Sequence, residues 1–278
     1  MYYAYLDETG QESKDWVYIA GFVGTEEQWR RFIPAWKEGF CGSQRKRLHM
    51  NKLKFERRSE KELLQRLGSV PVSCGLEPLI GGVRVSDYED LLGGDQFQEK
   101  MQAGYVVAVM PMLIQLCRWL PQDESVELVF EQQDRYAGLL NYNLTIIRSL
   151  EGMLANDGKP KVANWRFIRK GTSSLTEPGD YLAYAISHYR KDPHSVESQW
   201  CLPILKSVDS VRAIGAVLER NHARQWMSLV VAKQEELDLP KTSDEFEKFR
   251  KSANQIIKLS QDELKARLDL EGEPKKAT

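Results

Sequence analysis

The sequence predicts a mixed α/β domain in which a central sheet of parallel and antiparallel strands is flanked by helices. Two apolar runs rich in aromatic and β-branched residues, 2–6 and 16–23, open the chain, and the short polar gap between them favours an antiparallel hairpin. A third run, residues 126–130, is the clearest buried strand of the second half. Between these runs apolar residues recur at helical spacing, so helices should alternate with the strands.

The composition of the chain is typical of a soluble globular protein. Apolar residues make up 42% of the 278 positions and charged residues 28%, which argues against a disordered or membrane protein. The formal net charge is -1, so any binding of nucleic acid must come from a local basic patch. No apolar run reaches the roughly 18 residues that a membrane span needs. The four cysteines are widely spaced and form no C-x-x-C pair, which favours reduced thiols and a cytoplasmic location.

The first half of the chain predicts helices and further strands after the hairpin. Residues 25–28 have the spacing of a capping box for a helix that extends to about residue 40. Residues 59–62 have the same spacing and predict a second capped helix. Two β-like runs follow within residues 70–85, and together with the hairpin they predict an antiparallel meander.

The second half of the chain predicts helices around two strands, followed by a helical extension. The expected elements are helices at about 97–120 and 136–154, strands at 126–130 and 162–168, a polar loop at 172–179, a helix that begins near Asp180, and helical segments at 208–218, 222–237 and beyond 241. We therefore expect one domain over residues 1–192 and a helical extension over residues 193–278. The extension should pack on the core or on a protein partner, because an amphipathic helix usually buries its apolar stripe.

Acidic residues stand at the ends of several predicted elements. Asp7 and Glu8 end the first strand, Glu131 and Asp134 follow the strand at 126–130, and Asp180 stands at the start of a helix. A polar turn explains an acid after one strand, and capping explains an acid at a helix start. The same pattern, an acid at the end of an apolar element, recurs on separate elements. This recurrence favours an arrangement in which the carboxylates meet at one edge of the sheet. Such oxygen ligands suit Mg²⁺ or Mn²⁺, so we expect Asp7, Glu131 and Asp180 to form a metal centre, with Glu8 and Asp134 as further candidates.

A basic segment lies between the first two predicted helices. Its candidate phosphate-contacting residues are Arg45, Lys46, Arg47, Lys52 and Lys54, and His49 lies among them. A cationic run is often only a solvated face, and that interpretation and a phosphate-contacting patch stay open together.

Four short motifs, in this order, resemble the family catalogued as domain of unknown function 3800. They are D-E-T-G at residues 7–10, R-L-H-M-N-K-L around His49, V-E-L-V-F-E-Q-Q-D from residue 126, and E-P-G-D-Y-L-A-Y-A around Asp180. The resemblance covers roughly two-thirds of the chain, from the N-terminus to about residue 186.

The resemblance implies a ribonuclease-H-like fold in which Asp7, Glu131 and Asp180 are metal ligands and His49 replaces or assists a fourth carboxylate. Two positions depart from the family pattern. Glu131 stands where Asp is usual, so Asp134 is an alternative ligand, and Gly179 replaces the usual Ala before Asp180.

These features predict a metal-dependent nuclease. In this hypothesis Glu8 is a ligand or orients water, His49 acts as a general acid/base or contacts phosphate, and the basic segment meets DNA or RNA with low sequence preference. The alternative is a non-catalytic binding or regulatory module on the same scaffold, such as one partner in a phage-defence or mobile-element system.

Overall fold

The computed structural model describes residues 1–9, 16–84, 86, 108–109, 111–132, 140–141, 144, 161–169 and 171–218. Within them, six strands form one mixed sheet in the order β5-β4-β1-β2-β3-β6. The strands are β1 (Tyr2–Thr9), β2 (Trp16–Thr25), β3 (Glu77–Arg84), β4 (Val126–Gln132), β5 (Val162–Arg169) and β6 (Ile214–Leu218). β2 runs antiparallel to β1 and β3, whereas β4 is parallel to β1, β5 to β4, and β6 to β3. The predicted mixed α/β sheet flanked by helices is confirmed.

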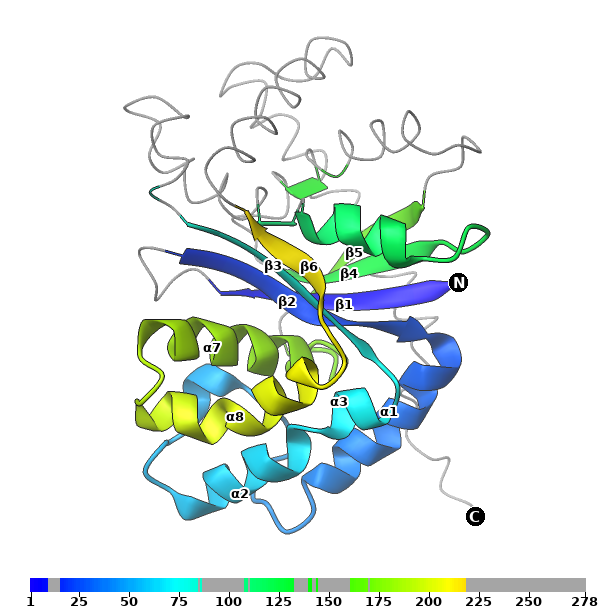
Figure 1. The fold of residues 1–278 in the computed structure, drawn as a ribbon. Coiled ribbons are helices and arrows are strands. Elements are labelled where there is room, and N and C mark those ends of the chain that lie inside the picture. The colour runs from blue at the N-terminus through cyan, green and yellow to red at the C-terminus, as the bar shows by residue number, and fades with distance from the viewer. Residues whose placement is uncertain are drawn as a thin grey trace, which may run out of the picture.

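Helices cover both faces of this sheet (Figure 1). The helices labelled in Figure 1 are α1 (Glu26–Gly39), α2 (Arg58–Leu67), α3 (Val70–Ser73), α7 (Glu177–Lys191) and α8 (Val196–Asp209), and a 3₁₀ turn, η1, spans Met50–Lys52. All five labelled α-helices lie on one face, and the helix of residues 111–119 lies on the other. Each face therefore has its own core, one with Leu6, Phe130 and Met112 and the other with Phe22, Trp36 and Tyr181.

Several predicted elements are confirmed by the structure. β1 and β2 pair antiparallel as predicted. The strands predicted at residues 126–130 and 162–168 fall within β4 and β5. At the start of α1, Gln28 N donates to Thr25 Oγ1 at 3.3 Å and Thr25 N donates to Gln28 Oε1 at 2.7 Å, which is the reciprocal pairing of a capping box. Of the helices predicted at 97–120 and 136–154, the described residues are largely helical, and the others lie outside the described part of the chain.

Two predictions for the region after α1 are wrong. Residues 70–73 form the short helix α3 rather than a strand, and Pro71 occupies its first turn, where a missing backbone N–H does no harm. The second helix begins at Arg58, and Arg57, rather than Ser59, is the residue that precedes it without a side-chain cap. The run at residues 77–84 is a strand as predicted, so the meander β1-β2-β3 forms.

Two predictions for the later part of the chain are also wrong. Residues 177–179 were expected in a loop, but α7 begins at Glu177, so Pro178 and Gly179 belong to its first turn. Residues 208–218 were expected to be helical, but the helix α8 ends at Asp209 and residues 214–218 form β6 beside β3. α8 packs against α7 and α2. The proposed boundary at residue 192 and the extension beyond it stay predictions, since residues 219–278 lie outside the described part.

The described helices are all too short or too polar to cross a bilayer.

Candidate functional site

Asp7 and Glu131 lie side by side near the carboxyl ends of two parallel strands. In the register of β1 and β4, Leu6 lies opposite Phe130, and continuing that register by one residue puts Asp7 beside Glu131. Because successive side chains of a strand alternate between faces, and Leu6 and Phe130 enter one core, the two carboxylates point to the opposite face, toward α7. Asp7 is 2% exposed and Glu131 is 8% exposed. Two neighbouring strands thus bring two buried carboxylates to one point.

The first turn of α7 packs directly on Asp7. A Cβ atom at Gly179 would lie 3.4 Å from Asp7 Cβ, 3.3 Å from Asp7 N and 3.1 Å from Ala20 O. The absence of a side chain at Gly179 therefore lets the helix approach the strand closely. The glycine that departs from the family pattern thus accompanies a tight contact between α7 and β1. Asp180, the next residue, is consequently held near the same end of the sheet.

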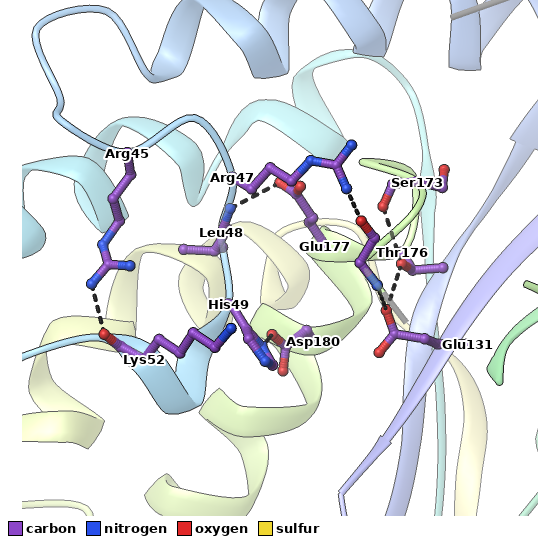
Figure 2. Close-up of a pocket in the computed structure, with 11 residues that line it drawn as sticks. Arg45, Arg47, Leu48, His49, Lys52, Glu131, Ser173, Thr176, Glu177 and Asp180 are labelled. Atoms are coloured by element: carbon purple, nitrogen blue, oxygen red, sulfur yellow. Dashed lines mark hydrogen bonds and ion pairs between the residues drawn. The ribbon is translucent and has the colours of Figure 1, made fainter. Parts of the chain in front are cut away.

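A polar cavity of about 260 Å³ lies at this end of the sheet (Figure 2). Its residues come from the segment between α1 and α2, from the end of β4, and from the first turn of α7 with the loop before it: Arg45, Arg47, Leu48, His49, Lys52, Glu131, Gly171, Ser173, Thr176, Glu177 and Asp180. One wall is therefore rich in cations and the other in carboxylates. Such a cavity can bind a ligand that carries both negative charge and a cation.

Asp180 binds the basic segment and does not cap its own helix. Its Oδ2 accepts a hydrogen bond from Met50 N at 2.9 Å and lies 3.2 Å from His49 Nδ1. The capping explanation considered from the sequence is thus wrong for this side chain, since Thr176 is the N-cap residue of α7. A carboxylate at one ring nitrogen orients the imidazole.

Glu177 is a further residue of the cavity wall that the sequence analysis missed. It is 6% exposed, and its Oε2 accepts hydrogen bonds from Trp36 Nε1 at 2.8 Å and from Leu48 N at 3.1 Å. Burial raises the pKa of Glu177 to about 7. The two hydrogen bonds and the Arg47 charge act to lower this pKa, whereas the Asp180 charge acts to raise it. The signal in the sequence is the E-x-x-D spacing, which places Glu177 and Asp180 on the same side of a helical turn.

Glu131 links β4 to the loop before α7. Its Oε1 accepts a hydrogen bond from Gly171 N at 3.0 Å and lies 3.4 Å from Thr176 Oγ1. Glu131 is therefore tied to the segment that carries Glu177 and Asp180 into position, which is consistent with its nearly complete burial.

The predicted cationic residues divide into two groups. Arg45 forms a paired ion contact with the buried Glu60, with Nε 2.7 Å from Oε2 and Nη2 2.8 Å from Oε1, and it also donates to Lys52 O. Arg45 therefore holds the segment together, and its contact with a phosphate stays a prediction. Lys46, Lys52 and Lys54 are exposed, whereas Arg47 is exposed but donates to Gly171 O across the cavity.

The carboxylates have the chemistry that a divalent cation requires, although the described residues do not form a complete ligand set. Asp7 and Glu131 are adjacent oxygen donors of the kind that Mg²⁺ and Mn²⁺ prefer. No group of three His, Cys, Asp or Glu residues among the described positions has the arrangement of a metal site. The side chain of Glu8, as well as the whole of Asp134, lies outside what the structure describes. A cation here would thus be held by the strand carboxylates, with further oxygen ligands completing its shell.

Comparison of the chain with models of known protein families finds no match, and comparison with curated proteins finds no relative. The fold and the cavity define an α/β protein with a carboxylate-rich site at the end of its sheet. The resemblance to the domain of unknown function 3800 family stays a prediction.

Proposed function

We propose that this protein is a nuclease that cleaves phosphodiester bonds with the help of Mg²⁺ or Mn²⁺. The observation that supports the proposal is that Glu131 and Asp180 line one cavity together with a basic segment, and that Asp7 lies beside Glu131 on the neighbouring strand. Phosphodiester cleavage needs stabilisation of negative charge on the phosphate, a group that moves a proton, and cations that hold the polynucleotide. Each of these requirements has a candidate residue in or beside this cavity.

The strand carboxylates are the proposed cation ligands. Asp7 and Glu131 would hold the ion, and Asp180 would contribute through Oδ1, which receives no hydrogen bond from the described residues. The bound ion would supply charge stabilisation at the phosphate and lower the pKa of a water molecule. Glu8 and Asp134 remain candidates to complete the ligand set.

His49 is the proposed proton-transfer residue. Its Nδ1 faces Asp180, so Nε2 is the ring nitrogen that remains for a substrate or water proton. Imidazole is suited to this task because one ring nitrogen can donate a proton while the other accepts one. The Asp180 contact would fix the ring orientation during the transfer.

The exposed lysines are the proposed contacts to the polynucleotide backbone. Lys52 lines the cavity, and Lys46 and Lys54 lie close to it in the same segment. Contacts of this kind neutralise phosphates without recognising bases, so binding should show little sequence preference and should weaken steeply with salt.

Cleavage assays on single- and double-stranded DNA and RNA, with Mg²⁺, Mn²⁺ or excess chelator, test this function. We expect Asp7→Asn to lower the rate by at least about 100-fold, because a charge-stabilising group is lost. The matched control is Asp123→Asn, which alters an exposed acid in the turn before β4. It should leave the rate unchanged. Full activity of Asp7→Asn, or full activity in chelator, would contradict the proposal.

Thermal denaturation with and without metal gives a second readout. A ligand that binds only the folded protein raises its melting temperature, so Mn²⁺ should stabilise the wild-type chain more than the Asp7→Asn variant. No stabilisation together with no cleavage would favour the non-catalytic binding module instead.

A further inference from the structure

Three consecutive residues of the basic segment are held by two carboxylates of α7. Leu48 N donates to Glu177 Oε2 at 3.1 Å, and Met50 N donates to Asp180 Oδ2 at 2.9 Å. His49 lies between these two attachment points, with Nδ1 3.2 Å from Asp180 Oδ2. The backbone is thus fixed on both sides of the imidazole, and the ring itself meets the second carboxylate.

Glu177 is in turn fixed by α1. Its Oε2 also accepts the indole N–H of Trp36, which is buried in the core between the sheet and the helices. One oxygen atom therefore joins α1, α7 and the segment that carries His49. Figure 2 shows its contact with Leu48. Glu177 and Asp180 are three residues apart on α7, a spacing that puts both side chains on one side of the helix.

The second carboxylate oxygen of Glu177 indicates that stability alone does not explain why a glutamate occupies this position. Its Oε1 is buried and receives no hydrogen bond from any residue that the structure describes. A buried oxygen without a partner lowers stability, so a glutamate is a poor choice for a purely structural contact. The charged groups that face it are Arg47 from the basic segment and Asp180 from its own helix.

We propose that Glu177 is a positioning residue for His49: by binding Leu48 N and Trp36 together, it sets the place of the imidazole at the cavity. The proposal rests on the proposed function in one respect, since the role of His49 in proton transfer comes from there. Glu177 does not touch the reacting atoms. It acts through the backbone that leads into His49.

Amide hydrogen exchange, followed by NMR on the full-length chain without metal or substrate, tests the positioning directly. Glu177→Met removes the acceptor at similar volume, and we expect exchange at both Leu48 and Met50 to rise at least about tenfold, because the segment opens locally. Glu177→Gln keeps an oxygen that accepts both hydrogen bonds and should leave both rates close to wild type. The matched control is Tyr181→Phe, which removes a buried hydrogen bond from α7 to Leu64 O without touching the segment.

Faster exchange at Leu48 alone, with Met50 unchanged, would overturn the proposal, because Glu177 would then hold only its own partner. Equal effects of Glu177→Met and Tyr181→Phe on Met50 would overturn it as well, since general destabilisation would explain both. If Glu177→Met does not fold, Glu177→Asp gives the same comparison, because it keeps the charge and shortens the reach by one methylene.

A double-mutant cycle tests whether the effect on activity passes through His49. We expect Glu177→Met to lower kcat about tenfold or more in the wild-type background and less than about twofold in a His49→Gln background. Equal losses in both backgrounds would overturn the positioning role. The exchange experiment decides the proposal even if the chain shows no cleavage, so failure of the nuclease function and failure of the positioning role are distinguishable.

Discussion

The two faces of the sheet differ in what their strands bury at the end of β1 and β4. On one face, Leu6 and Phe130 enter a core that the helix of residues 111–119 completes with apolar side chains. On the other, the next residues, Asp7 and Glu131, bury carboxylates beneath α7. Burial of a carboxylate is unfavourable unless it is paired or neutralised, whereas burial of an apolar side chain is the main source of stability. At this point of the sheet the first face is therefore apolar, whereas the second buries carboxylates that have partners, such as the hydrogen bond from Gly171 N to Glu131.

The largest expected effect on stability comes from the apolar face. Phe130 is fully buried and stacks on Phe167 with ring centroids 5.6 Å apart. We expect Phe130→Ala to lower the free energy of unfolding by about 3–5 kcal/mol, as measured by urea denaturation, because it leaves a cavity in a packed core.

The adjacent substitution Glu131→Gln supplies the contrast within the same strand. Its side-chain oxygen can still accept the Gly171 N–H, so stability should change by less than about 1.5 kcal/mol, the typical net value of one hydrogen bond. Comparable losses for Phe130→Ala and Glu131→Gln would show that both faces serve stability alike.

The second expected effect is a dependence of the free energy of unfolding on pH, which comes from Glu177. Its pKa is about 7 in the folded protein and 4.5 in the ordinary, unfolded-like environment, so the folded state binds more protons between these values. Its contribution to stability is therefore fully present below about pH 4.5, is lost as the pH rises toward 7, and stays lost above that. The difference corresponds to about 3 kcal/mol at most, since each pKa unit is about 1.4 kcal/mol.

Glu177→Gln isolates this contribution, because glutamine resembles the protonated acid and does not ionise. We expect the variant to match the wild-type protein in free energy of unfolding near pH 4.5 and to exceed it by up to about 3 kcal/mol near pH 8. Urea denaturation at both pH values measures the difference. An equal difference at both pH values would mean that folding does not raise the pKa of Glu177.

Sequence patterns predicted the strands and the acids at their ends because these signals are local. The apolar runs that became β1, β2, β4 and β5 alternate or cluster as strands do, and the capping box at residues 25–28 depends on four neighbouring residues. The pairing of Asp7 with Glu131 also follows once two parallel strands are adjacent.

Other parts of the site depend on contacts between distant residues and could not be predicted. Glu177 went unnoticed because Pro178 and Gly179 are typical of turns, whereas in the fold both lie in the first turn of α7. The hydrogen bonds that define its role join it to Trp36 and Leu48, more than 120 residues away in the chain. β6 was predicted as helix for a similar reason, since only its pairing with β3 makes residues 214–218 a strand.

The smallest expected effect concerns the contact between α7 and β1, where the carboxylate face is most tightly packed. Gly179→Ala should gain up to about 1 kcal/mol from helix propensity, because glycine is unfavourable inside a helix. The added methyl group would lie 3.1 Å from Ala20 O and 3.3 Å from Asp7 N, so β1 and α7 must separate by a few tenths of an ångström. We expect the two effects to offset each other, leaving the free energy of unfolding within about 1 kcal/mol of wild type while Asp7 and Asp180 move apart.

Urea denaturation measures the free energy of unfolding. The affinity for Mn²⁺ reports on the separation of Asp7 and Asp180, and we expect this affinity to weaken. A gain in stability with unchanged Mn²⁺ affinity would show that the close approach at Gly179 has no part in bringing the carboxylates together.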